Sequence, residues 1–311
     1  MKVEVTRDLR LTDEEVSLLS AHSFYNLVNV LVTDFRFLAL AVESDQTTRA
    51  SLQACRELLD SFKNRDKTLA VIDRADRYVA LFQKDLNAVV DLAISNTSFT
   101  PEKRKLVDAA VKNIENILAV FHHRVREALA RREGADRWVF ITLEEIKDNL
   151  TEFLEATALN SKDRFGIVYN EAEQTKKDYY VGMDFRSADD NVGLHAPFSL
   201  MDTLRDLTAN ARKYTPIGGR ILVQLQSDPS LLTLSISDNG RGIPEKELER
   251  VVEFGYRATN ALSGETQGGG FGLTKAYFFC KSFGGTMWID STEGKGTTII
   301  LSIPYSSKKQ P

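Results

Sequence analysis

The stretch GETQGGGFGLTKAYFFC, residues 264–280, concentrates glycine directly before an apolar segment with helical spacing. Gly268, Gly270 and Gly272 occupy alternate positions, in a G-x-G-x-G-L pattern that ends at Leu273. Glycine loses more conformational freedom on folding than any other residue, so such a concentration is costly. Bare backbone N–H groups at the beginning of a helix form a seat for phosphate. The stretch therefore predicts a phosphate-binding loop, although taken alone it also describes a glycine-rich surface loop.

A second segment, LRDLTANARKYTP at residues 204–216, combines a carboxylate, a carboxamide and a lysine. Asp206 and Asn210 are four residues apart, so on a helix their side chains share one face. Their oxygens are the ligand type that Mg²⁺ takes. Lys213 adds a positive charge for a phosphate. Taken alone, the same pattern also describes a solvated polar helix face.

Two further loops carry polar and glycine residues at strand ends. In SISDNGRGIP, Asp238 can accept a hydrogen bond from an exocyclic amine such as that of adenine. Gly240 and Gly242 let the base approach the main chain, although Asp-Asn-Gly is also a common turn. EGKGTT, with Gly294 and Gly296, predicts a hairpin turn directed toward the same place.

The elements that must position these residues fall into two parts. Residues 1–135 contain almost no glycine or proline, and their apolar residues recur at three and four, which is typical of amphipathic helices. We expect four long helices in an all-α bundle there. Residues 136–311 alternate helical segments with strand-like ones such as RILVQLQS and LLTLSISD. We expect an antiparallel sheet with helices on one face, an α+β sandwich.

Composition limits the class of protein. The chain has 311 residues, 42% hydrophobic and 27% charged, which suits two domains with cores of their own. A formal net charge of -4 argues against a nucleic-acid binder. Cys55 and Cys280 are the only cysteines, and we expect them to be core residues. The N-terminus has no secretory signal. The most apolar stretch contains Asp34 and Arg36, so we expect a cytoplasmic protein without a membrane span.

The order of these motifs resembles the ATP-binding domain shared by histidine kinases, a class of heat-shock chaperone, DNA gyrase and the MutL repair protein. The resemblance covers about residues 137–305. It implies a Bergerat-type ATP site in which Asn210, with Asp206, binds Mg²⁺ and Asp238 reads adenine. Residues 255–267 would form a mobile lid beside the aromatic Phe254. The other nucleotide contacts that it implies are Lys213, Tyr214, Gly240, Gly242, Ile243, Gly268, Gly269, Gly270, Phe271, Gly272, Leu273 and Thr297.

His22 is the candidate acceptor for a phosphoryl group. It lies in LLSAHSFYNLVNVL, with Asn26 four residues later on the same helix face. An imidazole on a rigid helix is a competent nucleophile toward a γ-phosphate. The stretch resembles the dimerisation and phosphoacceptor helix of histidine kinases, but Ser23 stands where many members carry an acidic residue, and serine is a poor general base. We expect the remaining histidines to be ordinary polar residues: His122, His123 and His195.

These resemblances predict an ATP- and Mg²⁺-dependent protein-histidine kinase of a two-component system. It would phosphorylate His22, pass the phosphoryl group to the receiver domain of a response regulator, and form a homodimer through the helical bundle. Residues 45–100 would be an additional helical pair.

Two alternatives stay open. One is a serine protein kinase resembling the mitochondrial ketoacid-dehydrogenase kinases, which FGYRAT fits, although no transit segment is found. The other is an ATP-controlled phosphatase or scaffold without kinase activity. In that case Asn26 would promote hydrolysis of a partner's acyl phosphate, and Ser23 favours this reading.

Overall fold

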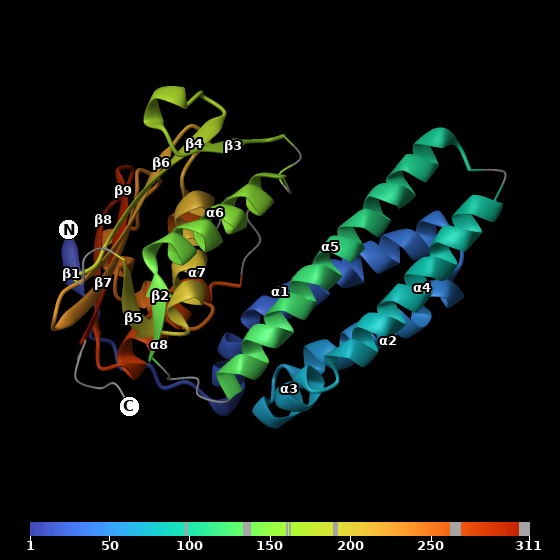
Figure 1. The fold of residues 1–311 in the computed structure, drawn as a ribbon, viewed down its shortest axis with the longest axis horizontal. Helices are drawn as coiled ribbons and strands as arrows, with labels where there is room; N and C mark the ends of the chain where they lie inside the picture. Colours follow the sequence, from blue (N-terminus) through green and yellow to red (C-terminus); the bar gives the residue numbers. More distant parts are fainter. Residues whose placement is uncertain are drawn as a thin grey trace. The chain divides into compact units, whose positions relative to one another are not determined.

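The computed structural model describes most of the chain, and its contacts divide the chain into two units (Figure 1). The helical unit comprises residues 10–134, and the α/β unit comprises residues 1–9 together with 135–311. The described residues are 1–96, 99–132, 138–159, 161, 163–188, 192–261 and 269–304.

The helical unit contains the four long helices that the periodicity predicts and one short one. They are α1 (Asp13–Ala41), α2 (Asp45–Ser61), α3 (Arg65–Ile72), α4 (Ala75–Ser95) and α5 (Pro101–Arg132). Thr12 and Glu15 form a reciprocal capping box at the start of α1. Asn64 caps α3 by accepting a hydrogen bond from the Lys67 N–H at 3.0 Å.

The core of the helical unit is aromatic and includes residues from α2, α3 and α4. Phe24 on α1 packs 5.9 Å from Phe62 and 5.5 Å from Phe121, measured between ring centroids. Phe82 of α4 is fully buried. Cys55 is also fully buried, and burial raises the pKa of its thiol to about 12, as befits an inert core residue. Helices α2, α3 and α4 therefore form part of the same core as α1 and α5.

The α/β unit is built on a seven-stranded sheet in the order β1-β8-β9-β7-β6-β4-β3. Helices α6, α7 and α8 lie along one face (Figure 1). A separate two-stranded sheet pairs β2 with β5. The elements are β1 (Lys2–Glu4), β2 (Trp138–Thr142), α6 (Leu143–Leu159), β3 (Gly166–Val168), β4 (Asp178–Arg186), β5 (Gly193–Pro197), α7 (Leu200–Tyr214), β6 (Arg220–Ser227), β7 (Leu231–Asp238), α8 (Gly272–Ser282), β8 (Thr286–Thr292) and β9 (Gly296–Pro304).

The sheet is mixed, which corrects the prediction of a wholly antiparallel one. β4 pairs in parallel with β6 and with β3, whereas β6, β7, β9 and β8 are antiparallel neighbours. The reason is the crossover through α7, which returns the chain to the same end of the sheet before β6 begins. Alternate residues face the helices, so Val223, Leu234 and Leu301 are almost fully buried.

The first nine residues belong to the α/β unit, whereas the sequence analysis assigned them to the bundle. β1 pairs antiparallel with the edge strand β8, with Val3 opposite Ile289 (Figure 1). An edge strand offers a row of unpaired N–H and C=O groups, and β1 satisfies those of β8. Val5 follows it into the core and is fully buried.

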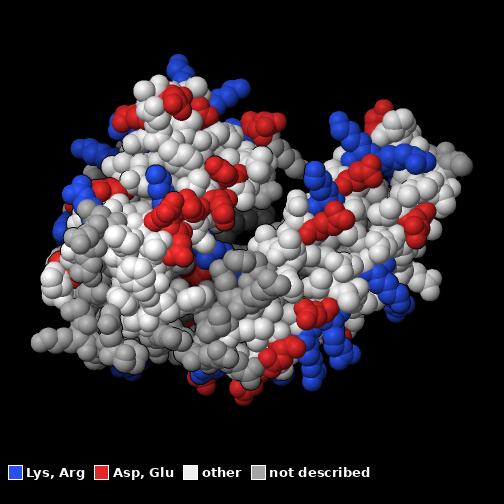
Figure 2. Space-filling model, in the orientation of Figure 1, with Lys and Arg blue, Asp and Glu red and all other residues white. Residues whose placement is uncertain are grey.

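Two surface properties bear on partners. Lys and Arg are interspersed with Asp and Glu on the face that Figure 2 shows. Within the described residues, α1 is long and apolar enough to cross a membrane, a test that core helices of soluble proteins also pass. Leu31 and Phe35 of this helix are fully buried in the helical unit. The absence of a membrane span and of nucleic-acid binding therefore stay predictions.

Candidate functional site

Three loops of the α/β unit meet where β7 ends. Asp238 is paired with Thr297 of β9, at the β8–β9 hairpin. A side chain at Gly296 would collide with the Asp238 carbonyl, and one at Gly240 would collide with the carbonyl of Tyr214 at the end of α7. The Arg241 N–H donates to that Tyr214 carbonyl at 3.0 Å. Glycine is needed here because backbone packs directly on backbone.

Asp238 is the partly buried carboxylate of this end of the sheet. It accepts a hydrogen bond from the Gly240 N–H at 2.8 Å, and further ones from the Thr297 backbone and the Thr215 side chain. Burial nevertheless outweighs these bonds and raises the pKa of Asp238 to about 6. A carboxylate in such surroundings is suited to accept a hydrogen bond from a neutral amine donor on a ligand.

Ser291 of β8 is a residue that the sequence analysis missed. Its hydroxyl accepts from the Ile243 N–H at 2.9 Å, donates to the Gly296 carbonyl at 2.9 Å, and lies 2.9 Å from the hydroxyl of Thr297. It is almost fully buried. Ser291 thus joins the Gly242–Ile243 loop to the hairpin. Its serine occupies an ordinary alternating strand position, so the local sequence carried no signal for this role.

Cationic side chains gather on the α7 side of the site. The Lys213 ammonium lies 5.3 Å and the Arg241 guanidinium 5.9 Å from the ring centroid of Tyr214. Burial, followed by the charges of Arg257 and Arg212, lowers the pKa of Lys213. A bound anion would reduce the repulsion between these positive side chains, so a phosphate group fits this side of the site. The sequence predicts a role for Lys213, whereas no local motif indicated one for Arg241 or Arg257.

Asp206 and Asn210 both face α8, as their spacing predicts. A side chain at Gly272, the first residue of α8, would collide with the Asn210 amide. The Asp206 carboxylate forms a 2.6 Å ion pair with Lys275, which the sequence analysis missed. Lys275 therefore already neutralises Asp206, and a metal-ligand role for Asp206 stays a prediction.

The same residues allow a test of whether Mg²⁺ fits. No group of three or more His, Cys, Asp or Glu side chains that could hold a metal lies within the described parts of the chain. Mg²⁺ bound with a nucleotide typically uses one or two protein oxygens, the phosphates and several waters. Asn210, lodged against the glycine that begins α8, fits that smaller requirement.

The phosphate loop is only partly within the described residues. Gly268 and residues 262–267 of the predicted lid lie outside them, whereas Gly269 and Gly270 are described. Gly270 has a φ of +75°, and its Cα lies so close to Gly255 and Tyr256 that a side chain would approach their backbone to 2.8 Å. Phe254 packs on Phe271, with ring centroids 4.7 Å apart.

His22 lies partly buried on α1, in the helical unit. Its Nε2 is 3.2 Å from the Asn26 side-chain nitrogen, so the predicted pair is in contact. An amide NH₂ only donates, so in this arrangement Nε2 carries the lone pair and Nδ1 the proton. His122 pairs with Asp76 at 3.2 Å, and His195 packs on Phe140. The side chain of His123 lies outside the described set.

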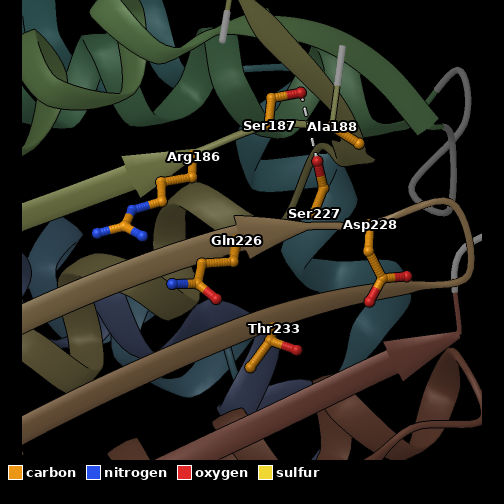
Figure 3. A pocket seen from close by; sticks show the side chains of 7 residues that line it. All are labelled: Arg186, Ser187, Ala188, Gln226, Ser227, Asp228 and Thr233. Atoms are coloured by element: carbon orange, nitrogen blue, oxygen red, sulfur yellow. Dashed lines mark hydrogen bonds between the residues drawn. The ribbon is translucent and has the colours of Figure 1, made fainter. Parts of the chain in front are cut away.

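A hollow at the opposite ends of β6 and β7 is separate from the site above. Figure 3 shows its lining, in which Ser227 donates to Ser187 at 3.4 Å. Arg186 forms an ion pair with Asp184 at 2.9 Å, and Asp228 accepts from the Ser230 N–H at 2.7 Å. Strand and turn contacts therefore already engage its charged groups, and we assign it no part in nucleotide binding.

Residues 196–307 match the family described as Histidine kinase-, DNA gyrase B-, and HSP90-like ATPase. The matched residues lie within the α/β unit, which confirms the predicted fold and the resemblance to the ATP-binding domain of histidine kinases.

Two relatives and one solved structure illustrate the similarity. Sensor histidine kinase WalK of Bacillus subtilis (strain 168) is 26% identical over 307 residues, covering 87% of this chain and 50% of that protein. Sensor histidine kinase Hik2 of Thermosynechococcus vestitus is 36% identical over 114 residues, covering 36% of this chain and 29% of Hik2. Full-length ShkA in complex with AMPPNP is 20% identical with a TM-score of 0.45, covering 75% of this chain and 46% of ShkA. The match thus spans about half the length of WalK and less than a third of the length of Hik2.

Replacing Gly272 by alanine should weaken binding of Mg²⁺-ATP by about tenfold, because the new methyl group would displace the Asn210 side chain. Gly272 begins a helix, where alanine itself is well tolerated. Calorimetric titration with and without Mg²⁺ checks this, and the loss should be confined to the Mg²⁺ form. Ser282→Ala, at the other end of α8, is the control, since the exposed Ser282 hydroxyl donates within the helix to the Phe279 carbonyl at 2.8 Å. Equal losses with and without Mg²⁺ would contradict the assignment.

Proposed function

We propose that this chain is an ATP-dependent protein-histidine kinase that phosphorylates His22 and passes the phosphoryl group to an aspartate of a response-regulator receiver domain. The observation that carries the proposal is the partly buried Asp238 among glycine-lined loops and cationic side chains. It occurs in the same chain as a His22–Asn26 pair on α1. The relationship to sensor histidine kinases supports the same reading.

The α/β unit would bind and orient ATP. Asp238 accepts from the adenine amine, while Gly240 and Gly242 let the loop that follows Asp238 pack against the backbone of Tyr214 and Thr292. Lys213 and Arg241 neutralise phosphate charge, and catalysis of phosphoryl transfer depends mainly on such positioning and neutralisation. Mg²⁺, held by Asn210 and the phosphates, would supply further stabilisation of the charge on the β- and γ-phosphate oxygens.

At His22 the lone pair of Nε2 would attack the γ-phosphorus. The bond from that phosphorus to the bridging oxygen breaks and ADP leaves with its electrons. The Nδ1 proton of the imidazole must then pass to a base. Asn26, which contacts Nε2 at 3.2 Å, is also placed to orient a water for the reverse, hydrolytic chemistry.

Replacing Ser23 by glutamate should raise the initial rate of autophosphorylation by about tenfold or more, because a carboxylate beside His22 would accept the imidazole proton. The measurement is the rate of label incorporation from γ-labelled ATP. Ser20→Glu is the matched control, since the Ser20 hydroxyl bonds only within its own helix, to the Val16 carbonyl at 2.9 Å. An unchanged rate in Ser23→Glu would show that proton removal is already provided for.

We also propose a homodimer formed through the helical unit. Val30, Phe37 and Leu40 are large apolar side chains of α1 that are 43%, 39% and 76% exposed. Their helical spacing aligns them with Asn26 and His22 on one face. An exposed apolar stripe of this kind favours self-association. A cytoplasmic location and a receiver-domain partner complete the proposal.

Incubation with γ-labelled ATP and Mg²⁺ tests the proposed reaction. We expect label on the protein that is labile to acid and stable to alkali, as a phosphoimidazole is. Acid-stable label on a serine of a partner protein would instead favour the ketoacid-dehydrogenase kinase type. Normal nucleotide binding without any label would favour the phosphatase or scaffold, for which Ser23 and the His22–Asn26 contact are the specific observations.

A further inference from the structure

We propose that Arg7 is a positioning residue of the nucleotide site, through which the N-terminal segment (residues 1–9) holds the turn at residues 253–256 against the phosphate loop. This inference rests on the proposed binding of ATP to the α/β unit. It concerns a segment that precedes the matched ATPase family region by nearly two hundred residues.

The segment is anchored first on the adenine side of the site. The amino group of Met1 donates to the Ser291 carbonyl at 2.9 Å, and the Ser291 N–H donates to the Met1 carbonyl at 3.0 Å. The side chain of Ser291 is the one that joins the Ile243 loop to the Gly296 hairpin. The residue before β1, Met1, therefore pairs with Ser291, the residue that holds two loops of the site together.

The chain then runs along β8 to α8. The Val5 N–H donates to the Met287 carbonyl at 2.9 Å, and the side chain of Val5 is fully buried. The hydroxyl of Tyr277 on α8 lies 2.8 Å from the Arg7 carbonyl and 3.2 Å from the Val5 carbonyl. The backbone of Arg7 is thus held in place, and its side chain extends from a fixed position.

The side chain of Arg7 contacts Glu253. The Arg7 guanidinium forms an ion pair with the Glu253 carboxylate, which is only 24% exposed and has a second cation, Arg250, at 3.7 Å. The Glu253 carbonyl accepts from the Thr274 hydroxyl at 3.0 Å and from the Tyr256 N–H at 3.1 Å. An ion pair to a partly buried carboxylate is screened less by water than a fully exposed one, so this pair restrains the turn.

The turn at residues 253–256 then limits where the phosphate loop can lie. Gly270 packs on the backbone of Gly255 and Tyr256, and the ring of Phe254 packs on that of Phe271. A shift of Glu253 would therefore move the surface on which Gly270 rests. The adenine contacts at Asp238 lie on another loop and would stay in place. Loss of Arg7 should accordingly affect phosphate binding and spare adenine binding.

The experiment compares Arg7→Gln with Lys2→Gln in the full chain. Lys2 is in the same segment, but its ammonium lies over the Trp288 ring, away from this turn. Dissociation constants for Mg²⁺-AMP-PNP and for adenosine are measured for each. Arg7→Gln should weaken binding of the triphosphate by about tenfold through loss of this ion pair, and leave binding of adenosine unchanged. Lys2→Gln should change neither.

The double variant Arg7→Glu with Glu253→Arg completes the test. Restoring the ion pair with reversed polarity should recover most of the triphosphate affinity that Arg7→Glu alone loses. Equal losses for adenosine and triphosphate, no loss in Arg7→Gln, or no recovery in the double variant would each overturn the positioning role. If the unaltered protein binds neither probe, the proposed ATP site itself fails, which is a distinguishable outcome.

Discussion

Replacing Asp238 by asparagine is expected to weaken binding of both ATP and adenosine by about 100-fold, because a neutral amide cannot replace the carboxylate as an acceptor. Asp238 already receives N–H groups from Gly240 and Thr297, which would claim the single amide oxygen. The amide NH₂ would then face the adenine amine, and two donors would meet. Calorimetric titration of both ligands measures the effect.

The same substitution should stabilise the ligand-free protein. The pKa of Asp238 is raised to about 6, so the folded state disfavours its ionised form. This cost is fully present above pH 6 and disappears as the pH falls below the ordinary pKa of the group. Asp238→Asn should therefore raise the free energy of unfolding by about 1–3 kcal/mol at pH 7 and by much less near pH 4.

Binding should follow the same ionisation. Adenosine carries no titrating phosphate, and its affinity for the unaltered protein should fall by about tenfold between pH 7 and pH 5, as Asp238 becomes protonated. Asp228→Asn is the control, because hydrogen bonds from Ser230 hold the pKa of that exposed turn carboxylate low. If Asp238→Asn binds adenosine as tightly as the control does, Asp238 does not contact the base.

Replacing His22 by glutamine is expected to abolish incorporation of acid-labile label while leaving ATP affinity unchanged. Glutamine keeps hydrogen-bonding capacity on the helix but has no nucleophilic nitrogen, so only the phosphoacceptor is lost. The measurement is label retained on the protein after incubation with γ-labelled ATP, alongside a nucleotide titration.

His122→Gln is the matched control, since His122 is also on a long helix and contacts a neighbouring side chain, Asp76. It should incorporate label at the unaltered rate. Label that persists in His22→Gln, or that disappears equally in His122→Gln, would contradict the assignment of His22 as the acceptor.

The parts of the site that the sequence reveals are those encoded over short spans. The glycines could be located because positive φ and close backbone approach exclude other residues, as Gly270 and Gly296 illustrate. Asp206 and Asn210 could be assigned to one face because helical spacing is local. The contact of Asn26 with His22 follows from the same four-residue spacing.

The remaining features depend on contacts between residues far apart in the sequence. Lys275 neutralises Asp206 across 69 residues, and the Met1 backbone pairs with Ser291 across 290. Strand β1 has only three residues, too few for alternation to distinguish it from the beginning of the helical region. Parallel pairing of β4 with β6 depends on the crossover that α7 makes, which strand composition alone does not encode.

A crystal structure with Mg²⁺-AMP-PNP bound tests the central claim most directly. We expect the adenine amine within hydrogen-bond distance of the Asp238 carboxylate, the metal on the amide oxygen of Asn210, and phosphate oxygens at the N–H groups that begin α8. Nucleotide bound elsewhere, for example in the hollow lined by Arg186 and Asp228, or bound here without contact to Asp238, would contradict it.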